Sequence, residues 1–321
     1  MGSMTRRAFL STGAAAAAWA SSPHRARADA ATMAFASTTG AVGLVTQVVR
    51  RLELEKKYDL KLDVKILDPA AGEKAVLLRQ VDAGVFPVIT AADVRDKGLD
   101  LVVFAPLLYM HIHLVVWNDS TAKSLADLRG KRIGVLDKVS GAYRGCQILA
   151  ARGGLDFERD FQPVTGPPPA LVTFLQRKQV DALAIHEPIV SKLLAEGKFR
   201  VVMSLNDEWK KTAKSDWLFV GAAAHRDWLT RNRTVAKRLA DMLVEAMRQL
   251  SRAPDLVEAE AEFLGLKTKP EIDLARERLL RFFPTEWNEA AVAGAMEPVR
   301  EAARLGQIKQ MPTQELLTVL R

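Results

Sequence analysis

The sequence predicts an α/β protein with two lobes, each built on a parallel sheet, and three observations support this fold class. Segments typical of strands and helices alternate from residue 31 onward. The alternation stops at the polar stretch 118–131 and then starts again. No long Gly- or Ser-rich linker separates the two halves. Because alternating strands and helices form helix-covered parallel sheets, and a flexible tether is missing, we expect two lobes joined by extended strands.

The first half of the alternation gives the elements of one lobe. Short apolar runs predict strands, and longer segments with apolar residues three or four positions apart predict amphipathic helices. On this basis strands are expected at 31–35, 60–67, 85–90 and 99–108, and helices at 40–58, 72–84 and 91–98.

The second half repeats the pattern and then changes character. Strands are expected at 111–117, 132–136, 161–164, 181–185 and 199–205, and helices at 141–154, 166–180 and 187–198. Four successive helices are then expected at 233–251, 254–264, 270–281 and 287–303. The strand-like run 215–225 is placed to return the chain to the first lobe. We therefore expect lobe one at 31–115 with 217–321, lobe two at 116–216, and hinge strands near 110–118 and 214–220.

Residues 1–28 are expected to be an export signal and not part of the fold. Arg6 and Arg7 precede a short alanine-rich run, and the step Ala26-Arg27-Ala28, with small residues on both sides of the arginine, follows it. The paired arginines resemble a twin-arginine signal, which predicts a periplasmic protein. The apolar run is too short for a bilayer core of about 30 Å. The alternative, an N-terminal amphipathic helix, would need an apolar stripe that this run lacks.

Composition limits the classes of function. Without residues 1–28 the chain has 293 residues, and the formal charge of +8 falls to +4 because four arginines and no acid leave. So small an excess, without a dense basic tract and interleaved aromatics, argues against nucleic-acid binding. The single cysteine, Cys146, excludes an internal disulfide. We expect a monomer without a cofactor or a metal.

Two junctions combine hydroxyl groups with glycine directly after a predicted strand. Ser37-Thr38-Thr39-Gly40 precedes the first helix, and Ser140-Gly141 begins the helix at 141–154. In open α/β sheets ligands bind at the carboxyl ends of strands, where helix N-termini offer free N–H groups to polar or anionic groups. One such junction alone is equally explained as a helix cap. A pair, one per predicted lobe, favours a ligand site between the lobes.

Three further stretches carry a resemblance to a known family. They are SLADLRGKRIGV at 124–135, VSG at 139–141 and VDALAIHEPIVSKLLAEGK at 180–198. Together they resemble the second lobe of periplasmic solute-binding proteins of the nitrate, sulfonate and taurine type, to which bacterial thiamine-precursor binders are similar. The likeness covers essentially all of the mature chain, although Gln179 stands where the family commonly has a glycine.

The resemblance implies a type II periplasmic-binding-protein fold and a role without catalysis. Such proteins capture a sulfonate, taurine, nitrate, a thiamine precursor or a similar small solute between two closing lobes. They deliver it to the permease and ATPase subunits of an ABC importer. The resemblance implies that ligand contacts come from Ser37, Thr38, Thr39, Thr90, Ala91, Ser140, Gly141, His186 and Glu187. To these we add Tyr143 at the start of the helix at 141–154 and Trp217 beside a hinge strand.

The sequence leaves the charge of the ligand open. Glu187 lies near a helix start, where the helix dipole favours a carboxylate for structural reasons alone. If the ligand carries an amine, Glu187 is its natural partner. Lys138 and Arg144 are the nearest basic candidates, and no motif places either of them in the cleft.

Two other readings rest on single residue types. His111 and His113 share one face of a predicted strand, as metal ligands do, but no further ligand accompanies them, so structural histidines are expected. Cys146 lies inside a predicted helix and is expected to be a buried small hydrophobe, although a desulfinase-like or pyrimidine-synthase-like enzyme on the same fold remains an alternative. A third alternative is a periplasmic protein that senses its ligand.

Overall fold

The computed structural model describes residues 31–95, 97–309, 311–312 and 315–321. Ala31–Arg321 forms one compact unit, whereas the predicted export signal at 1–28 lies outside the described residues. None of the helices in these ranges is long and apolar enough to cross a membrane.

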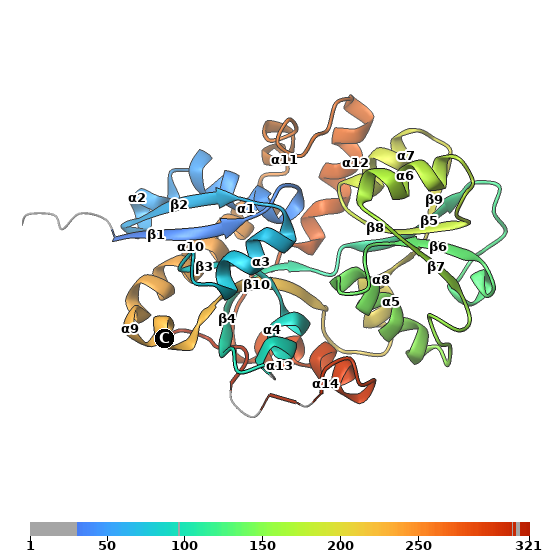
Figure 1. Cartoon of the computed structure of the whole chain (residues 1–321). Coiled ribbons are helices and arrows are strands. Elements are labelled where there is room, and N and C mark those ends of the chain that lie inside the picture. Colours follow the sequence, from blue (N-terminus) through green and yellow to red (C-terminus); the bar gives the residue numbers. More distant parts are fainter. Residues whose placement is uncertain (1–30, 96, 310, 313–314) are drawn as a thin grey trace, which may run out of the picture. The chain divides into compact units, whose positions relative to one another are not determined.

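The first of two sheets has five strands in the order β2-β1-β3-β10-β4 (Figure 1). β1 pairs in parallel with β2 and β3, whereas β10 pairs antiparallel with β3 and β4. The bounds are β1 Ala31–Ser37, β2 Leu60–Ile66, β3 Ala83–Pro87, β4 Leu101–Tyr109 and β10 Leu218–His225.

The second sheet has the same size and the same mixed pattern. Its order is β7-β6-β8-β5-β9, with β6 parallel to β7 and β8, and β5 antiparallel to β8 and β9. The bounds are β5 Ile112–Trp117, β6 Arg132–Val135, β7 Gln162–Thr165, β8 Ala182–His186 and β9 Phe199–Ser204.

The predicted fold class is confirmed, and one feature of the sheets was not anticipated. In each sheet four strands run in one direction and one strand, β10 in the first sheet and β5 in the second, runs antiparallel to its neighbours. Only residues 110–111 separate β4 from β5. Because no crossover helix lies between these strands, nothing holds β5 parallel to the strands of the sheet that it joins. The lobe boundaries expected from the sequence remain a prediction.

Helices cover both sheets. In the first sheet α1 packs on β1, α10 on β4, and α3 on β3. In the second, α6 and α7 contact β8, and α8 contacts β5 and β9. The helix bounds are α1 Ala41–Arg51, α2 Leu54–Tyr58, α3 Pro69–Leu77, α4 Val88–Arg95, α5 Gly141–Arg152, α6 Pro168–Gln176, α7 Ile189–Ala195, α8 Leu205–Lys210, α9 Arg226–Arg231, α10 Arg233–Arg252, α11 Asp255–Ala259, α12 Lys269–Leu279, α13 Glu289–Ala295 and α14 Glu297–Arg304, with 3-10 turns η1 Ala126–Leu128 and η2 Leu280–Phe282.

Several predicted elements differ from the structure. The helix expected at 72–84 ends at Leu77, the one at 254–264 ends at Ala259, and the one at 287–303 is divided into α13 and α14. The helix expected at 40–58 is broken into α1 and α2 at Glu53, whose φ of 49° is left-handed. The strand expected at 85–90 ends at Pro87, and α4 begins at once, so a loop after Thr90 does not exist. Within the polar stretch 118–131 the chain forms the 3-10 turn η1, where Ser124 and Asp127 bond each other's backbone N–H groups as in a capping box.

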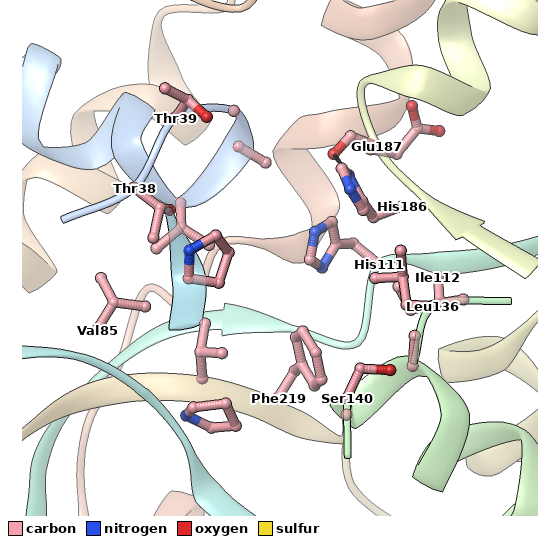
Figure 2. Close-up of a pocket in the computed structure, with 18 of the residues that line it drawn as sticks. Thr38, Thr39, Val85, His111, Ile112, Leu136, Ser140, His186, Glu187 and Phe219 are labelled. Carbon is pink, nitrogen blue, oxygen red and sulfur yellow. Dashed lines mark hydrogen bonds between the residues drawn. The ribbon is translucent and has the colours of Figure 1, made fainter. Parts of the chain in front are cut away.

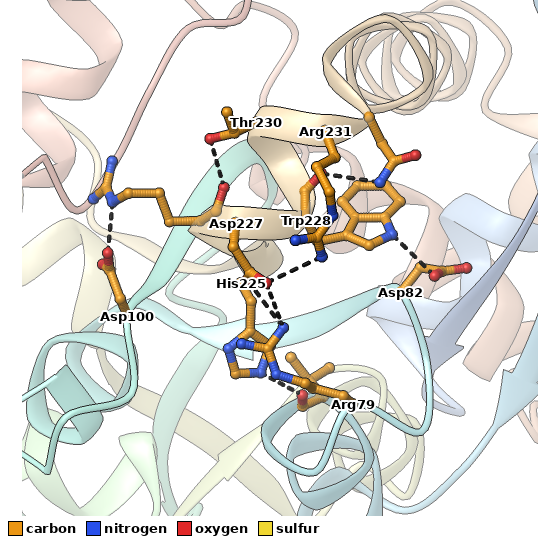
Figure 3. Close-up of polar contacts among 11 residues, drawn as sticks. Arg79, Asp82, Asp100, His225, Asp227, Trp228, Thr230 and Arg231 are labelled. Carbon is orange, nitrogen blue, oxygen red and sulfur yellow. Dashed lines mark hydrogen bonds and ion pairs between the residues drawn. The ribbon is translucent and has the colours of Figure 1, made fainter.

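The short helix α9 was missed in the sequence, and a network of polar contacts fixes it beside the first sheet (Figure 3). Arg79 Nη1 lies 2.9 Å from Asp227 Oδ1, and Trp228 Nε1 donates to Asp82 at 3.0 Å. These contacts join residues far apart in the chain. Contacts between residues far apart in the chain leave no pattern in the local sequence. In addition, a helix of six residues is too short to show a helical periodicity of apolar residues.

The C-terminal helices also contact the second sheet's helices. α12 packs against α7, and α14 contacts both α4 and α5. Arg281 Nη2 adds an ion pair to Asp207 Oδ2 at 2.9 Å. The two sheets are therefore held together by these helices as well as by the crossing strands.

Candidate functional site

A cavity of about 180 Å³ lies where residues from both sheets meet (Figure 2). Most of its surface is apolar, from residues such as Val85, Ile112, Leu136 and Phe219. Its full lining is Thr38, Thr39, Gly40, Ala41, Val42, Pro69, Glu73, Val85, Pro87, His111, Ile112, Leu136, Ser140, Gly141, Ala142, His186, Glu187, Phe219 and Val220.

Among the helices that begin at this cavity are α1 from the first sheet and α5 from the second. The N-cap of α1 is Gly40, whose φ of 77° favours glycine and which provides no side-chain cap. The first N–H groups of a helix have no partner within it, so α1 and α5 offer free donors to a ligand. At α5, Ser140 Oγ accepts one such N–H, from Tyr143 at 3.2 Å. A side chain at Gly141 would collide with Phe219, 2.2 Å from the Cβ position.

The predicted hydroxyl residues do not all reach the cavity. Thr38 and Thr39 line it, as does Ser140 (Figure 2). Ser37 is fully buried and outside the lining, with its Oγ 3.4 Å from Thr46 Oγ1.

His111 and His186 form one wall of the cavity, and their rings point toward it (Figure 2). His186 Nδ1 donates to the carbonyl oxygen of Glu187 at 3.0 Å. Nδ1 of His111 is buried and has no hydrogen-bond partner among the described residues. Burial, with a smaller contribution from His186, lowers the pKa of His111 to about 3, and burial also lowers the pKa of His186. Both rings are therefore neutral near pH 7.

Glu73 is a cavity residue that the sequence analysis missed. It lies one turn into α3, whose start is fixed by Pro69 and by Asp68 Oδ1, which accepts the Ala71 N–H. Burial raises the pKa of Glu73 to about 7, against a lowering influence of the Arg144 charge. Its carboxyl group has neither a hydrogen bond nor an ion pair within the described part of the chain.

Glu187 differs, because partners outside the cavity occupy its carboxylate. Oε1 lies 2.7 Å from Arg278 Nε, and Oε2 accepts from the N–H and the O–H of Ser191 at 3.0 and 2.7 Å. The residue is fully buried, and its carboxylate is turned away from the cavity centre (Figure 2).

The other predicted contact residues lie outside the cavity lining. Thr90 and Ala91 are inside α4, because β3 ends earlier than expected. Tyr143 is buried, and its hydroxyl donates to Glu158 at 2.8 Å. Trp217 is buried against Trp209, with ring centroids 4.9 Å apart.

The basic candidates also have partners elsewhere. Arg144 Nη2 lies 3.5 Å from Asp93 Oδ2, and Lys138 Nζ lies 2.9 Å from Glu158 Oε1. Neither residue lines the cavity.

Cys146 and His113 have structural surroundings. Cys146 is buried, as expected, and burial raises the pKa of its thiol to about 12. His113 is buried beside Glu187, with Nε2 3.6 Å from Oε1. The described residues contain no group of three His, Cys, Asp or Glu side chains arranged to hold a metal ion.

The missed residues gave only weak signals. His111 was considered only as half of a metal-like pair, although it stands in an apolar run next to a strand crossing. Glu73 follows the helix-start signal Asp68-Pro69, so its place one turn into a helix could be predicted. That this turn faces the second sheet was not, because it depends on tertiary structure.

Two α/β sheets joined by crossing strands, with a cavity lined from both, define a two-lobed solute-binding architecture. Residues 51–264 match the family described as ABC transporter, phosphonate, periplasmic substrate-binding protein. This match covers well over half of the chain, and the chain belongs to that family. The resemblance noted in the sequence is thereby confirmed.

Individual relatives agree with this assignment. A protein of Escherichia coli K12 named as an aliphatic sulfonates-binding protein is 30% identical over 173 residues, or 52% of this chain and 53% of its own length. A binding protein of Brucella abortus is 27% identical over 145 residues, covering 44% of this chain and 43% of its own. The matched stretches thus span about half the length of these relatives.

Solved structures share the fold over nearly the whole chain. The periplasmic aliphatic sulphonate binding protein SsuA of E. coli has a TM-score of 0.71 at 20% identity, covering 88% of this chain and 94% of its own. The alkanesulfonate-binding protein SsuA of Xanthomonas axonopodis, bound to MOPS, has a TM-score of 0.70 at 19% identity, covering 91% and 99%.

Proposed function

We propose that this chain is the periplasmic substrate-binding component of an ABC importer. The observation that carries the proposal is the cavity between the two sheets, where the N-termini of α1 and α5 converge. A site built from both sheets can couple ligand binding to closure about the crossing strands, and the permease and ATPase subunits would recognise the closed form. The family membership supports this role. We further propose a monomer that is exported through the twin-arginine signal at 1–28.

The proposed ligand is a small organic molecule with a polar or anionic group at the two helix N-termini. Thr38, Thr39 and Ser140 lie beside these N–H groups, and helix N-termini favour anions. Relatives named for sulfonates and phosphonates support an anionic group. The apolar remainder of the lining would enclose the organic part.

The proposal excludes catalysis by this chain. The only thiol in the sequence, Cys146, lies outside the cavity, is buried, and stays protonated near neutral pH. A desulfinase would need that thiol activated and exposed to substrate.

A thermal-shift screen of the mature protein tests the proposal. Alkanesulfonates, nitrate, phosphonates, taurine, thiamine precursors and aromatic acids form the panel. A ligand at 100 times its Kd stabilises the folded state by about 2.7 kcal/mol, a readily measured rise in Tm. Stabilisation by a compound that is recovered unchanged supports binding without catalysis. Consumption of the compound, or a flat screen, would contradict the proposal.

A matched pair of variants locates the site. Thr39→Ala removes a hydroxyl from the cavity, and we expect affinity to fall about threefold to tenfold. Thr230→Ala removes a hydroxyl that bonds Arg226 O on α9, outside the cavity, and should leave affinity unchanged. Equal affinities for both variants would refute the site.

A further inference from the structure

The wall of the cavity formed by His111 and His186 presents hydrogen-bond acceptors and no donors. The carbonyl oxygen of Glu187 can only accept, so the proton of the neutral His186 ring lies on Nδ1. Its Nε2 is therefore an unprotonated acceptor.

His111 adds a second acceptor. Only 5% of the residue is exposed, its ring lines the cavity, and Nδ1 has no partner among the described residues. A hydrogen bond with the backbone of Tyr109 raises the pKa of the ring. A neutral imidazole carries one N–H, so one of the two ring nitrogens of His111 is an acceptor.

The charges around the cavity agree with these acceptors. Among the described residues, the lining includes Glu73 and Glu187 and neither lysine nor arginine. Arg278 neutralises Glu187 from the side away from the cavity. The carboxyl group of Glu73 is left as a third acceptor without a protein partner.

The walls limit the size and shape of the ligand. The cavity volume is about 180 Å³, and an apolar cavity of about 150 Å³ holds a benzene molecule. The ring of His111 lies 5.7 Å from that of Phe219 and 5.8 Å from that of His186, measured between centroids. These rings make an aromatic wall on which a flat body can pack.

We propose that the ligand is about the size of one substituted ring and carries an N–H donor, which His186 Nε2 and the acceptor nitrogen of the His111 ring accept, with Glu73 as an additional acceptor. The inference rests on the proposed function and narrows its ligand class. An alkyl or aryl oxyanion without an N–H group would leave the acceptor wall unpaired. The opposite end of the molecule would lie at the N-termini of α1 and α5.

Calorimetric titration with matched probes tests this inference. 4-Aminobenzenesulfonate and 4-methylbenzenesulfonate have nearly the same size and the same anionic group, and only the first has N–H donors. A second pair, 4-aminobenzoate and 4-methylbenzoate, replaces the sulfonate by a carboxylate and again differs only in an amino group against a methyl group. We expect the amino member of each pair to bind at least about tenfold more tightly, because a missing donor leaves buried acceptors unpaired.

Variants connect this preference to the wall. His111→Phe keeps a ring and removes the acceptor, so the ratio of the two affinities should fall close to one. His225→Phe makes the same substitution at a buried histidine outside the cavity, and should keep the wild-type ratio. Glu73→Gln, which retains size, should lower the ratio and serves if His111→Phe does not fold.

The outcomes separate the inference from the proposed function. Equal or tighter binding of the methyl members would overturn the inference and leave a solute-binding protein. So would an unchanged ratio in both His111→Phe and Glu73→Gln. If none of the four probes binds, the inference is also overturned, because the ring size and the N–H donor of the ligand were both inferred from this cavity. The broader screen of sulfonates, phosphonates and nitrate decides independently whether the chain binds a solute at all.

Discussion

Two regions at the meeting point of the sheets each hold a glutamate out of bulk solvent, Glu187 fully buried and Glu73 partly buried, and among the described residues only Glu187 has protein partners for its carboxylate. At the β8–α7 junction, Glu187 is fully buried and bonded to Arg278 and Ser191. In the first turns of α3, Glu73 faces the cavity without a hydrogen bond or an ion pair in the described residues. The sequence suggested Glu187 as the partner of a ligand that carries an amine, whereas of these two carboxylates the one without a protein partner in the described residues is that of Glu73.

The difference shows how a buried carboxylate can be assigned. A carboxylate whose oxygens all have protein partners stabilises the fold and has little left for a ligand. An unpaired one beside a cavity is destabilising in the empty protein, and proteins retain such groups where they act on something. This contrast makes four predictions, which follow from the largest effect to the smallest.

Arg278→Met should lower the free energy of unfolding by about 3–5 kcal/mol, because it leaves Glu187 as a buried charge without its counter-ion. Urea denaturation followed by circular dichroism measures the change. Arg276→Gln on the same helix is the control. Its partners Asp255 and Glu258 are mostly exposed, so a change below about 1 kcal/mol is expected. If both variants lose a similar free energy of unfolding, the buried pair with Glu187 is no more important for stability than the exposed pairs of Arg276.

Glu73→Gln should stabilise the empty protein, and more so as the pH rises. In the folded protein the pKa of Glu73 is raised from 4.5 to about 7, so the folded state binds this proton more tightly than the unfolded state does. The wild-type contribution is present below pH 4.5 and is lost as the pH rises to 7.

Because glutamine does not titrate, the variant escapes this loss. We expect a gain of about 2–3 kcal/mol at pH 8 and well under half of that at pH 5. Melting curves at the two pH values measure it, and a gain independent of pH would show that Glu73 is not protonated on folding.

Ser140→Ala should cost about 1 kcal/mol, because Ser140 Oγ caps α5 through the Tyr143 N–H. This hydroxyl, like Glu187, already has a protein partner. Chemical denaturation should therefore detect its loss even without ligand. An unchanged midpoint would mean that another group caps the helix.

Thr39→Ala should change the stability of the empty protein by less than about 0.5 kcal/mol, because this exposed side chain has no hydrogen-bond partner among the described residues. Like Glu73, Thr39 is a polar cavity residue without a protein partner among the described residues, but it is uncharged and the expected effect is smaller. A loss as large as that of Ser140→Ala would contradict the contrast between paired and unpaired cavity residues.

The sequence predicted the strand–helix order well where elements are long and bounded by clear signals. α10 was expected at 233–251 and spans Arg233–Arg252, and β2 was expected at 60–67 and spans Leu60–Ile66. Short elements fixed by distant contacts were not predicted, as α9 shows. The early end of β3 at Pro87 moved Thr90 and Ala91 from an expected loop into α4.

By itself, the sequence determined the fold class and the two helix starts that face the cavity, at Gly40 and Ser140. Periodicity, hydroxyl caps and glycine are local properties, and they act over a few neighbouring residues. Only the tertiary structure decided which polar groups are left unpaired there. Arg278 lies 91 positions from Glu187 and satisfies its carboxylate, whereas no residue does so for Glu73 in the described part of the chain. Pairing across such distances depends on how helices pack, and local sequence does not record it.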